Sequence, residues 1–280
     1  QNASRSGVES SSRPERTRHR SEIRLDAVPP VPADLRRQVV EVPSLSELWP
    51  YVDINTLLSK HLGVQGEVKR KISEGDPKTA GILSEVRRVF DLAEQEKLIR
   101  ARGVFQFFPA AAVGDEIRIL AGSTERFAFP RQAQAPYLCL ADYLRPLSGP
   151  DGGGHDYLGL MVVTAGIGVR QAAQAMKEQG AYLHSHMLQA LALELAEALA
   201  QRAHEQMRAL WGIVPEQGMR VSPGYAVCPN LADQVKIMRL LNAEELGITL
   251  TEDYMLDPEA SVSALVFAHP DARYFTLDRV

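Results

Sequence analysis

The chain has 280 residues, of which 45% are hydrophobic and 24% charged, and its formal net charge is -4. These values are typical of a globular protein that can bury a core in one large domain or two small ones. The mild acidity gives no reason to expect nucleic acid, no apolar run reaches the length of a membrane span, and the two distant cysteines, Cys139 and Cys228, argue against a disulfide scaffold or a zinc knuckle. We therefore expect a reducing, cytoplasmic environment.

Residues 1–38 are predicted to form a flexible linker. Residues 1–12 are rich in serine, residues 13–24 are basic, and residues 27–33 contain three prolines. Such a composition buries too little apolar surface to offset the entropy lost on ordering. The basic stretch is compatible with a docking arm, but a tether that happens to be basic is the simpler interpretation. Because the chain begins with Gln1 and not Met, we expect it to be a piece of a longer protein.

An ordered domain is expected over residues 39–280. Ser44 and Glu47 have the spacing of a capping box, which predicts a short helix at 44–48. Apolar residues at helical spacing predict further helices over 79–100, 170–177, 181–210 and 231–241. Apolar runs bounded by turn residues predict strands over 104–108, 116–120, 157–165, 262–267 and 274–277, with a short strand or turn over 137–143. The glycine-rich loop at 149–154 lacks the Lys-Ser/Thr end of a phosphate loop.

The order of these elements indicates an α+β fold. Strands and helices are mixed without the regular alternation of a parallel βαβ fold, and the hairpin-like neighbours favour antiparallel pairing. We therefore expect a single domain with a largely antiparallel twisted sheet and surrounding helices.

The stretch from Arg220 to Tyr225 carries the most specific chemistry. Pro223 fixes φ and Gly224 can adopt backbone angles closed to other residues, so the backbone there can come close to a ligand. Arg220 offers a planar fork that suits a carboxylate, and Tyr225 offers a flat apolar face with a hydroxyl at its tip. This set could hold a small zwitterion with an aromatic portion, although a Pro-Gly turn beside a surface arginine is the simpler interpretation of these residues alone.

Other polar groups are less specific. Asp53 lies in an apolar run and, if buried, needs a ligand ammonium or a structural arginine as its partner. His184 and His186 fall on different faces of a helix, which disfavours shared metal ligation. We place His204 on the polar side of the long helix and expect Glu197 to face solvent or a partner protein. No HExxH, GxSxG, paired CxxC or GxGxxG motif stands out, so we predict neither catalytic residues nor a metal site.

Several separated landmarks, in a characteristic order and spacing, connect the chain to a known family. They are Tyr51-Val52-Asp53, Arg102-Gly103-Val104, Phe108-Pro109-Ala110, Val113-Gly114-Asp115, residues 139–143, 156–159, 195–198 and 220–225, Cys228-Pro229, residues 260–263, His269-Pro270-Asp271 and Tyr274-Phe275. From about residue 39 to its end, the chain resembles the C-terminal activation domain of cobalamin-dependent methionine synthase, which binds S-adenosylmethionine.

The resemblance implies a ligand site. Members of the family hold S-adenosylmethionine with the residues that match Asp53, Arg220, Ser222, Pro223, Gly224, Tyr225, Tyr274 and Phe275. Arg220 is then expected to bind the methionyl carboxylate, Asp53 the ammonium, and the turn the adenosine end. This chain has Phe275 where a tyrosine is familiar and Ile54 where a tryptophan is familiar. The loop before Arg220 is short, which leaves Glu216 as a weak match for an acidic contact.

The resemblance also implies a reaction. The domain is expected to donate the methyl group of S-adenosylmethionine when oxidised cob(II)alamin is reactivated with one electron from flavodoxin or a related reductase, as part of a methyltransferase of methionine biosynthesis. Cobalamin is expected on the neighbouring cobalamin-binding domain of the same polypeptide, to which residues 1–38 resemble the connection. Because the cobalt is the nucleophile, this domain needs only to position the donor. Two alternatives stay open: a non-catalytic docking module for a corrinoid protein or flavodoxin, and a separate corrinoid reactivase acting in trans.

Overall fold

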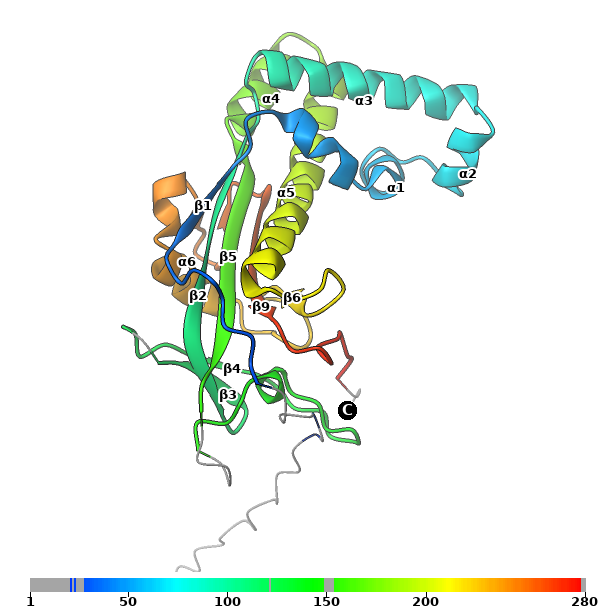
Figure 1. The fold of residues 1–280 in the computed structure, drawn as a ribbon. Coiled ribbons are helices and arrows are strands. Elements are labelled where there is room, and N and C mark those ends of the chain that lie inside the picture. Colours follow the sequence, from blue (N-terminus) through cyan, green and yellow to red (C-terminus); the bar gives the residue numbers. More distant parts are fainter. Residues whose placement is uncertain (1–20, 22, 24–27, 121, 149–153, 278–280) are drawn as a thin grey trace, which may run out of the picture.

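The computed structural model describes residues 21, 23, 28–120, 122–148 and 154–277 (Figure 1). Its centre is a seven-stranded sheet in the order β4-β3-β2-β5-β9-β6, with β1 also paired to β2. The strands are β1 (Gln38–Glu41), β2 (Arg100–Val113), β3 (Glu116–Ile119), β4 (Arg126–Ala128), β5 (Asp156–Ile167), β6 (Met219–Val221) and β9 (Ser261–Phe267). Neighbouring strands pair antiparallel throughout this sheet, as predicted. A separate hairpin joins β7 (Thr249–Leu250) to β8 (Leu256–Asp257).

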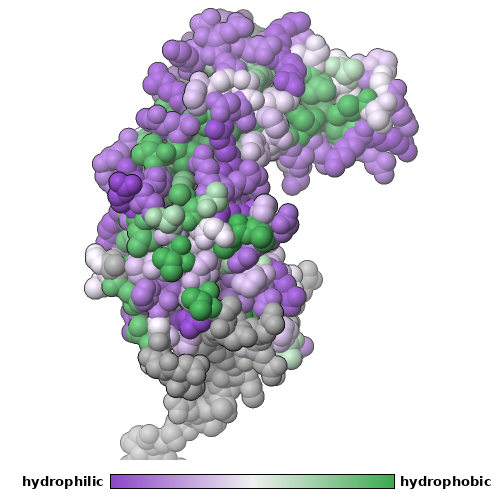
Figure 2. Space-filling model, in the orientation of Figure 1, coloured by the Kyte–Doolittle hydropathy of each residue, from purple (hydrophilic) through white to green (hydrophobic). Residues whose placement is uncertain are grey.

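Helices cover both faces of the sheet. The longer ones are α3 (Pro77–Gln95), α4 (Val169–Glu178), α5 (Tyr182–Trp211) and α6 (Asp233–Leu241). Shorter helical segments are η1 (Leu45–Glu47), η2 (Trp49–Tyr51), α1 (Ile54–Thr56), η3 (Leu57–His61), α2 (Val68–Ser73), η4 (Leu140–Tyr143) and η5 (Ala243–Leu246). Figure 1 shows α5 and α6 on opposite sides of the sheet. In the view of Figure 2, hydrophilic residues dominate the top of the surface, while hydrophobic residues gather in patches on the arm at the upper right and lower down.

The strand pattern explains the two covered faces. Along β2, Phe105 and Phe107 point to the core beneath α5, whereas Val104 and Phe108 point to the core beneath α6. Successive side chains of a strand lie on opposite faces, so a strand that is apolar at nearly every position supplies two cores at once. The central strands β2 and β5 are therefore nearly continuous apolar runs. Such runs are more typical of parallel sheets, which are usually buried on both faces, but this sheet is antiparallel.

Helix α5 packs unusually close to the sheet. Gly159 of β5 makes this possible, because a Cβ built on it would lie only 2.4 Å from the terminal methyl of Met207 and 3.2 Å from the ring of Trp211. Trp211 in turn packs against Phe107 at a tilt of 60°, with ring centroids 4.6 Å apart. The helix ends at Gly212, whose φ of 68° is left-handed, as is usual after the last helical turn.

Most predicted elements are confirmed, with shifted ends. Helices α3, α4, α5 and α6 and strands β3, β5 and β9 lie within a few residues of their expected positions. The strand expected at 104–108 is much longer, because its second half continues into a hairpin with β3. Residues 137–143 contain the 3-10 helix η4, and the expected loop at 149–154 lies outside the described residues except for Gly154.

Two local predictions were wrong. Ser44 does cap η1, but Glu47 does not return a bond to it and instead forms an ion pair of 2.7 Å with Arg202 of α5. The strand expected at 274–277 does not form. A side chain binds a backbone carbonyl there instead: Gln132 Nε2 donates to Thr276 O at 2.7 Å. The short strand β6 was not predicted, since three residues give too little periodicity to recognise.

Candidate functional site

Arg220 lies in the middle of the edge strand β6 and faces helix α5. Its neighbours Met219 and Val221 are buried in the core on the α6 side, so alternation turns the Arg220 side chain to the other face. There its Nη2 lies 3.1 Å from Oε2 of Glu197. The Arg220 side chain is 23% exposed, which leaves part of the guanidinium open to a ligand.

The turn after β6 is held by its own backbone. Gly224 has a φ of 98° and donates its N–H to Cys228 O at 2.8 Å, while Cys228 N donates to Tyr225 O at 2.8 Å. A side chain at Gly224 would also approach Leu231 to 3.0 Å. Of the predicted turn residues, Pro223 is buried and Ser222 half-buried, whereas the Tyr225 ring is exposed. The turn therefore presents an aromatic ring and backbone next to Arg220.

The terminal aromatic pair is divided between the surface and the core. The Tyr274 hydroxyl donates a hydrogen bond to the backbone oxygen of Arg220. Desolvation at this hydroxyl raises the pKa of Tyr274, while the charge of Arg220 opposes the increase. Phe275 instead packs against the core on the α6 side. The structure thus brings Tyr274, but not the Phe275 ring, to Arg220.

Asp53 is exposed, so it does not need the arginine partner that a buried carboxylate would require. It caps α1, where its Oδ1 accepts from Thr56 N at 3.1 Å and its Oδ2 from Thr56 Oγ1 at 2.7 Å. These hydrogen bonds lower the pKa of Asp53. The carboxylate is therefore ionised and is held in place by its own helix start.

Two glutamates of α5, Glu194 and Glu197, interact electrostatically with residues predicted for the site. Glu194 is buried, and its Oε1 lies 3.2 Å from His61 Nε2. Burial raises the pKa of Glu194, His61 opposes this, and the nearby charges of Asp53 and Glu197 raise it further. We call Asp53, Glu194 and Glu197, whose charges interact, the acidic group; of the three, Glu197 contacts Arg220. Glu197 was expected to face solvent or a partner protein, and Glu194 was not predicted as a site residue; their i, i+3 spacing on a predicted helix was the available signal.

His204 was placed on the polar side of α5, and this was wrong. It is only 3% exposed. Burial, reinforced by the charges of Arg208 and Arg220, lowers the pKa of His204 to about 3, so the ring is neutral. Arg208 fastens the loop before β6 by donating from Nε to Gln217 O at 2.9 Å. This end of α5 is buried because the β6 loop folds over it, a long-range contact that helical periodicity does not reveal.

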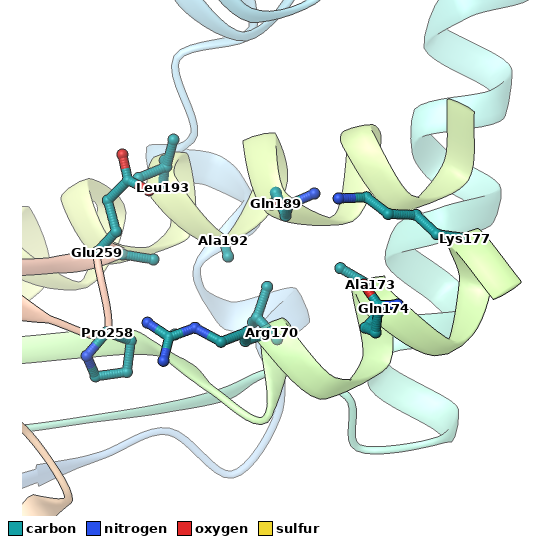
Figure 3. Close-up of a pocket in the computed structure, with 12 residues that line it drawn as sticks. Arg170, Ala173, Gln174, Lys177, Gln189, Ala192, Leu193, Pro258 and Glu259 are labelled. Carbon is teal, nitrogen blue, oxygen red and sulfur yellow. The ribbon is translucent and has the colours of Figure 1, made fainter. Parts of the chain in front are cut away.

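A separate cavity of about 400 Å³ lies between α4, α5 and the segment 258–260 (Figure 3). Figure 3 shows the Lys177 and Gln189 side chains directed toward each other across it. Arg170, at its rim, is already paired with Asp257 at 2.5 Å. None of the ligand-binding residues predicted from the sequence lines this cavity, so we do not assign the ligand site to it. Within the described part of the chain, no group of three or more His, Cys, Asp or Glu side chains is placed to hold a metal ion.

Comparison with known proteins decides the family. A family model described as "Vitamin B12 dependent methionine synthase, activation domain" matches residues 44–280. The chain belongs to this family. The activation domain is 28% identical to a methionine synthase of Mycobacterium tuberculosis over an alignment of 292 residues. The alignment covers 92% of this chain and 24% of that protein. The chain thus spans about a quarter of the curated relative.

A solved structure supports the fold of the activation domain. It is described as "Crystal Structure of the MetH Reactivation Domain bound to AdoHcy", and it aligns with a TM-score of 0.83 and 30% identity. The alignment covers 91% of this chain and 85% of that one. The expected α+β fold is therefore confirmed. No helix in the described residues combines the length and apolarity needed to cross a bilayer.

Proposed function

We propose that this activation domain binds S-adenosylmethionine beside Arg220 and supplies its methyl group for the reductive reactivation of cob(II)alamin in a methionine synthase. Membership of the family supports this proposal. So does the ligand named for the structural neighbour, since AdoHcy is what S-adenosylmethionine becomes when its methyl group leaves. The site is assigned from one observation: Glu197 and Tyr274 both contact Arg220.

The residues at this surface fit such a ligand. Glu197 shows that a carboxylate can approach the Arg220 guanidinium, so the methionyl carboxylate can take or share that position. The acidic group beside it favours the ligand's ammonium and its positive sulfonium. Tyr225 and Tyr274, each 61% exposed, offer ring faces to the adenine or to the sulfonium.

Each predicted site residue then has a role in positioning. Asp53 attracts the ammonium from its place at the start of α1. The backbone of Ser222, Pro223 and Gly224 approaches the nucleoside, because its hydrogen bonds fix the turn beside Arg220. Phe275 anchors the C-terminal segment in the core, so that Tyr274 stays at the surface. S-adenosylmethionine supplies an electrophilic methyl group, and these side chains bind and orient it without acting as acid or base.

The wider assembly is part of the proposal. We infer that residues 39–280 form the activation domain and that residues 1–38 connect it to a cobalamin-binding domain of the same polypeptide. Flavodoxin or a related reductase would supply the electron, and the intact protein would act in cytoplasmic methionine biosynthesis. The landmarks shared with the family and the partial coverage of the curated relative support this arrangement.

Isothermal titration calorimetry with S-adenosylmethionine and AdoHcy tests the proposal. We expect saturable binding of both ligands at one site. The absence of saturation with either would contradict the site and would favour the docking module. Transfer of labelled methyl from S-adenosylmethionine to a reduced corrinoid protein tests the second half; binding without transfer would restrict the domain to ligand recognition.

A further inference from the structure

The described N-terminal residues line two adjoining cavities at the lower end of the domain. One, of about 300 Å³, is lined by Val28, Pro29 and Pro30, and the other, of about 390 Å³, by Ser21 and Ile23. Both cavities are also lined by Tyr143 and Pro270, so they adjoin each other, and we call the face of the domain that borders them, from Tyr157 and His269 to Tyr143, the groove. Figure 1 shows the segment after residue 28 running from this end of the molecule up to β1.

The segment 28–32, Val-Pro-Pro-Val-Pro, has the pattern of a polyproline II helix. Val28 and Val31, three residues apart, are 85% and 63% exposed. Pro29 and Pro32, also three apart, are half-buried and buried. A period of three residues per turn is that of polyproline II, so one edge of the segment faces the domain and another faces solvent. Three prolines stiffen the backbone and restrict the residue before each of them, so little entropy is lost on docking.

The groove has the chemistry that recognises such a helix. Tyr143, Tyr157 and His269 line it, and the rings of Tyr143 and His269 lie 5.8 Å apart. Aromatic walls bind the flat faces of proline rings, and polar side chains among them can meet the exposed carbonyls of a polyproline II ligand. Arg145 and Gln217 supply polar groups in the same cavity.

Hydrogen bonds fasten the segment on both sides of the prolines. The Ser21 hydroxyl donates to the buried carboxylate of Asp142, which Arg131 also holds through two hydrogen bonds of 2.6 and 2.8 Å. On the other side, Ala33 N donates to Leu210 O at 2.8 Å. Leu210 lies in the last turn of α5, where helical carbonyls lack partners within the helix.

We propose that this groove is a proline-recognition site and that its occupant is the chain's own segment 28–32. Without docking, the N-terminal chain would leave the domain at β1. With the segment docked, it leaves at the groove beside Tyr143. The site is independent of the S-adenosylmethionine surface, since the two share no residue. A groove that binds its own chain reversibly also accepts the same sequence in trans once the segment is displaced.

Amide hydrogen exchange at Ala33, measured by NMR on the full chain, tests the role of the prolines. In a variant with Pro29→Ala, Pro30→Ala and Pro32→Ala, we expect Ala33 to exchange about tenfold faster after correction for intrinsic rates. The matched control is Val31→Ala, which alters only the exposed edge and should exchange like the parent. Parental protection of Ala33 in the proline variant would overturn the proposal.

A labelled peptide with the sequence of residues 28–34 tests the groove itself. We expect it to bind the proline variant saturably and to bind the parent at least about tenfold more weakly, because the parent's own segment competes at high effective concentration. Adding His269→Ala to the proline variant should abolish binding while leaving the melting temperature nearly unchanged. Failure of the peptide to bind the proline variant, or equal binding after His269→Ala, would overturn the assignment.

Discussion

The guanidinium of Arg220 lies 3.1 Å from the carboxylate of Glu197, on a helix 23 residues earlier in the chain. The pair joins the edge of the sheet to α5 at the surface where the backbone of Arg220 also receives the Tyr274 hydroxyl. A partly exposed ion pair contributes little to stability by itself. Its value here is geometric, because it holds the arginine fork in one orientation beside the acidic group.

Replacing Arg220 by alanine should weaken S-adenosylmethionine binding by about 2 kcal/mol or more, because a charge-assisted contact to the carboxylate is lost. That corresponds to a roughly thirtyfold higher Kd in calorimetry. Arg126→Ala, on the edge strand β4, is the control and should leave the Kd unchanged. Equal affinities of Arg220→Ala and the parent would remove Arg220 from the site.

The Tyr274 hydroxyl should matter for affinity more than for folding. Tyr274→Phe keeps the ring but removes the hydrogen bond to the Arg220 backbone, so binding should weaken by about 1 kcal/mol. The free energy of unfolding in urea should change by less than about 1 kcal/mol, since the side chain is largely exposed. A large loss of stability with unchanged affinity would contradict this assignment.

Two glycines should respond to alanine in opposite directions. A Cβ at Gly103 of β2 would lie 2.5 Å from Val163 Cγ1 and 2.9 Å from the Val162 carbonyl oxygen, so Gly103→Ala should destabilise the domain by about 1–3 kcal/mol. Gly81, inside α3, has open space around its Cβ position, so Gly81→Ala should stabilise by about 0.5–1 kcal/mol. Urea denaturation of both variants checks the signs; a stable Gly103→Ala protein would show that β2 and β5 can move apart.

His204 should make the domain less stable in acid. Its pKa falls from the ordinary 6.5 to about 3 in the folded protein, so below pH 6.5 the unfolded chain takes up a proton that the folded protein does not. Stability from this group is therefore fully present above pH 6.5 and is lost progressively as the pH falls toward 3. Between pH 7.5 and 5, urea unfolding should show a loss of about 1–2 kcal/mol that His204→Phe reduces. His186→Gln, at an exposed position, should keep the parental pH dependence.

The two cysteines should be inert in the folded domain. Burial raises the pKa of both Cys139 and Cys228 to about 12, so almost no thiolate forms near pH 8. A disulfide-exchange reagent should label them only as fast as the protein unfolds, and completely in denaturant. Rapid labelling of either thiol under native conditions would show local opening around it.

Local sequence pattern predicted the long elements but not how they meet. Helix α5 was visible because its leucines repeat at helical spacing, and β5 because its apolar run is continuous. The pairing of Glu197 with Arg220 was not visible, since it depends on β6 joining the edge of the sheet next to α5. The burial of His204 was missed for the same reason. The predicted strand at 274–277 failed because side-chain hydrogen bonds there replace the ladder that the pattern implied.

Helix α5 also fixes the spacing of two charged side chains at the proposed ligand surface. Glu194, whose pKa is raised in part by the charge of Asp53, and Glu197, which pairs with Arg220, are separated by three residues, or roughly 4.5 Å of helix rise. An α-amino acid carries its ammonium and carboxylate on the same carbon atom, so the acidic and basic groups that bind them have to lie close together. The pitch of α5 meets that requirement in advance, and inserting one residue between these glutamates would rotate one of them by about 100° off the shared face.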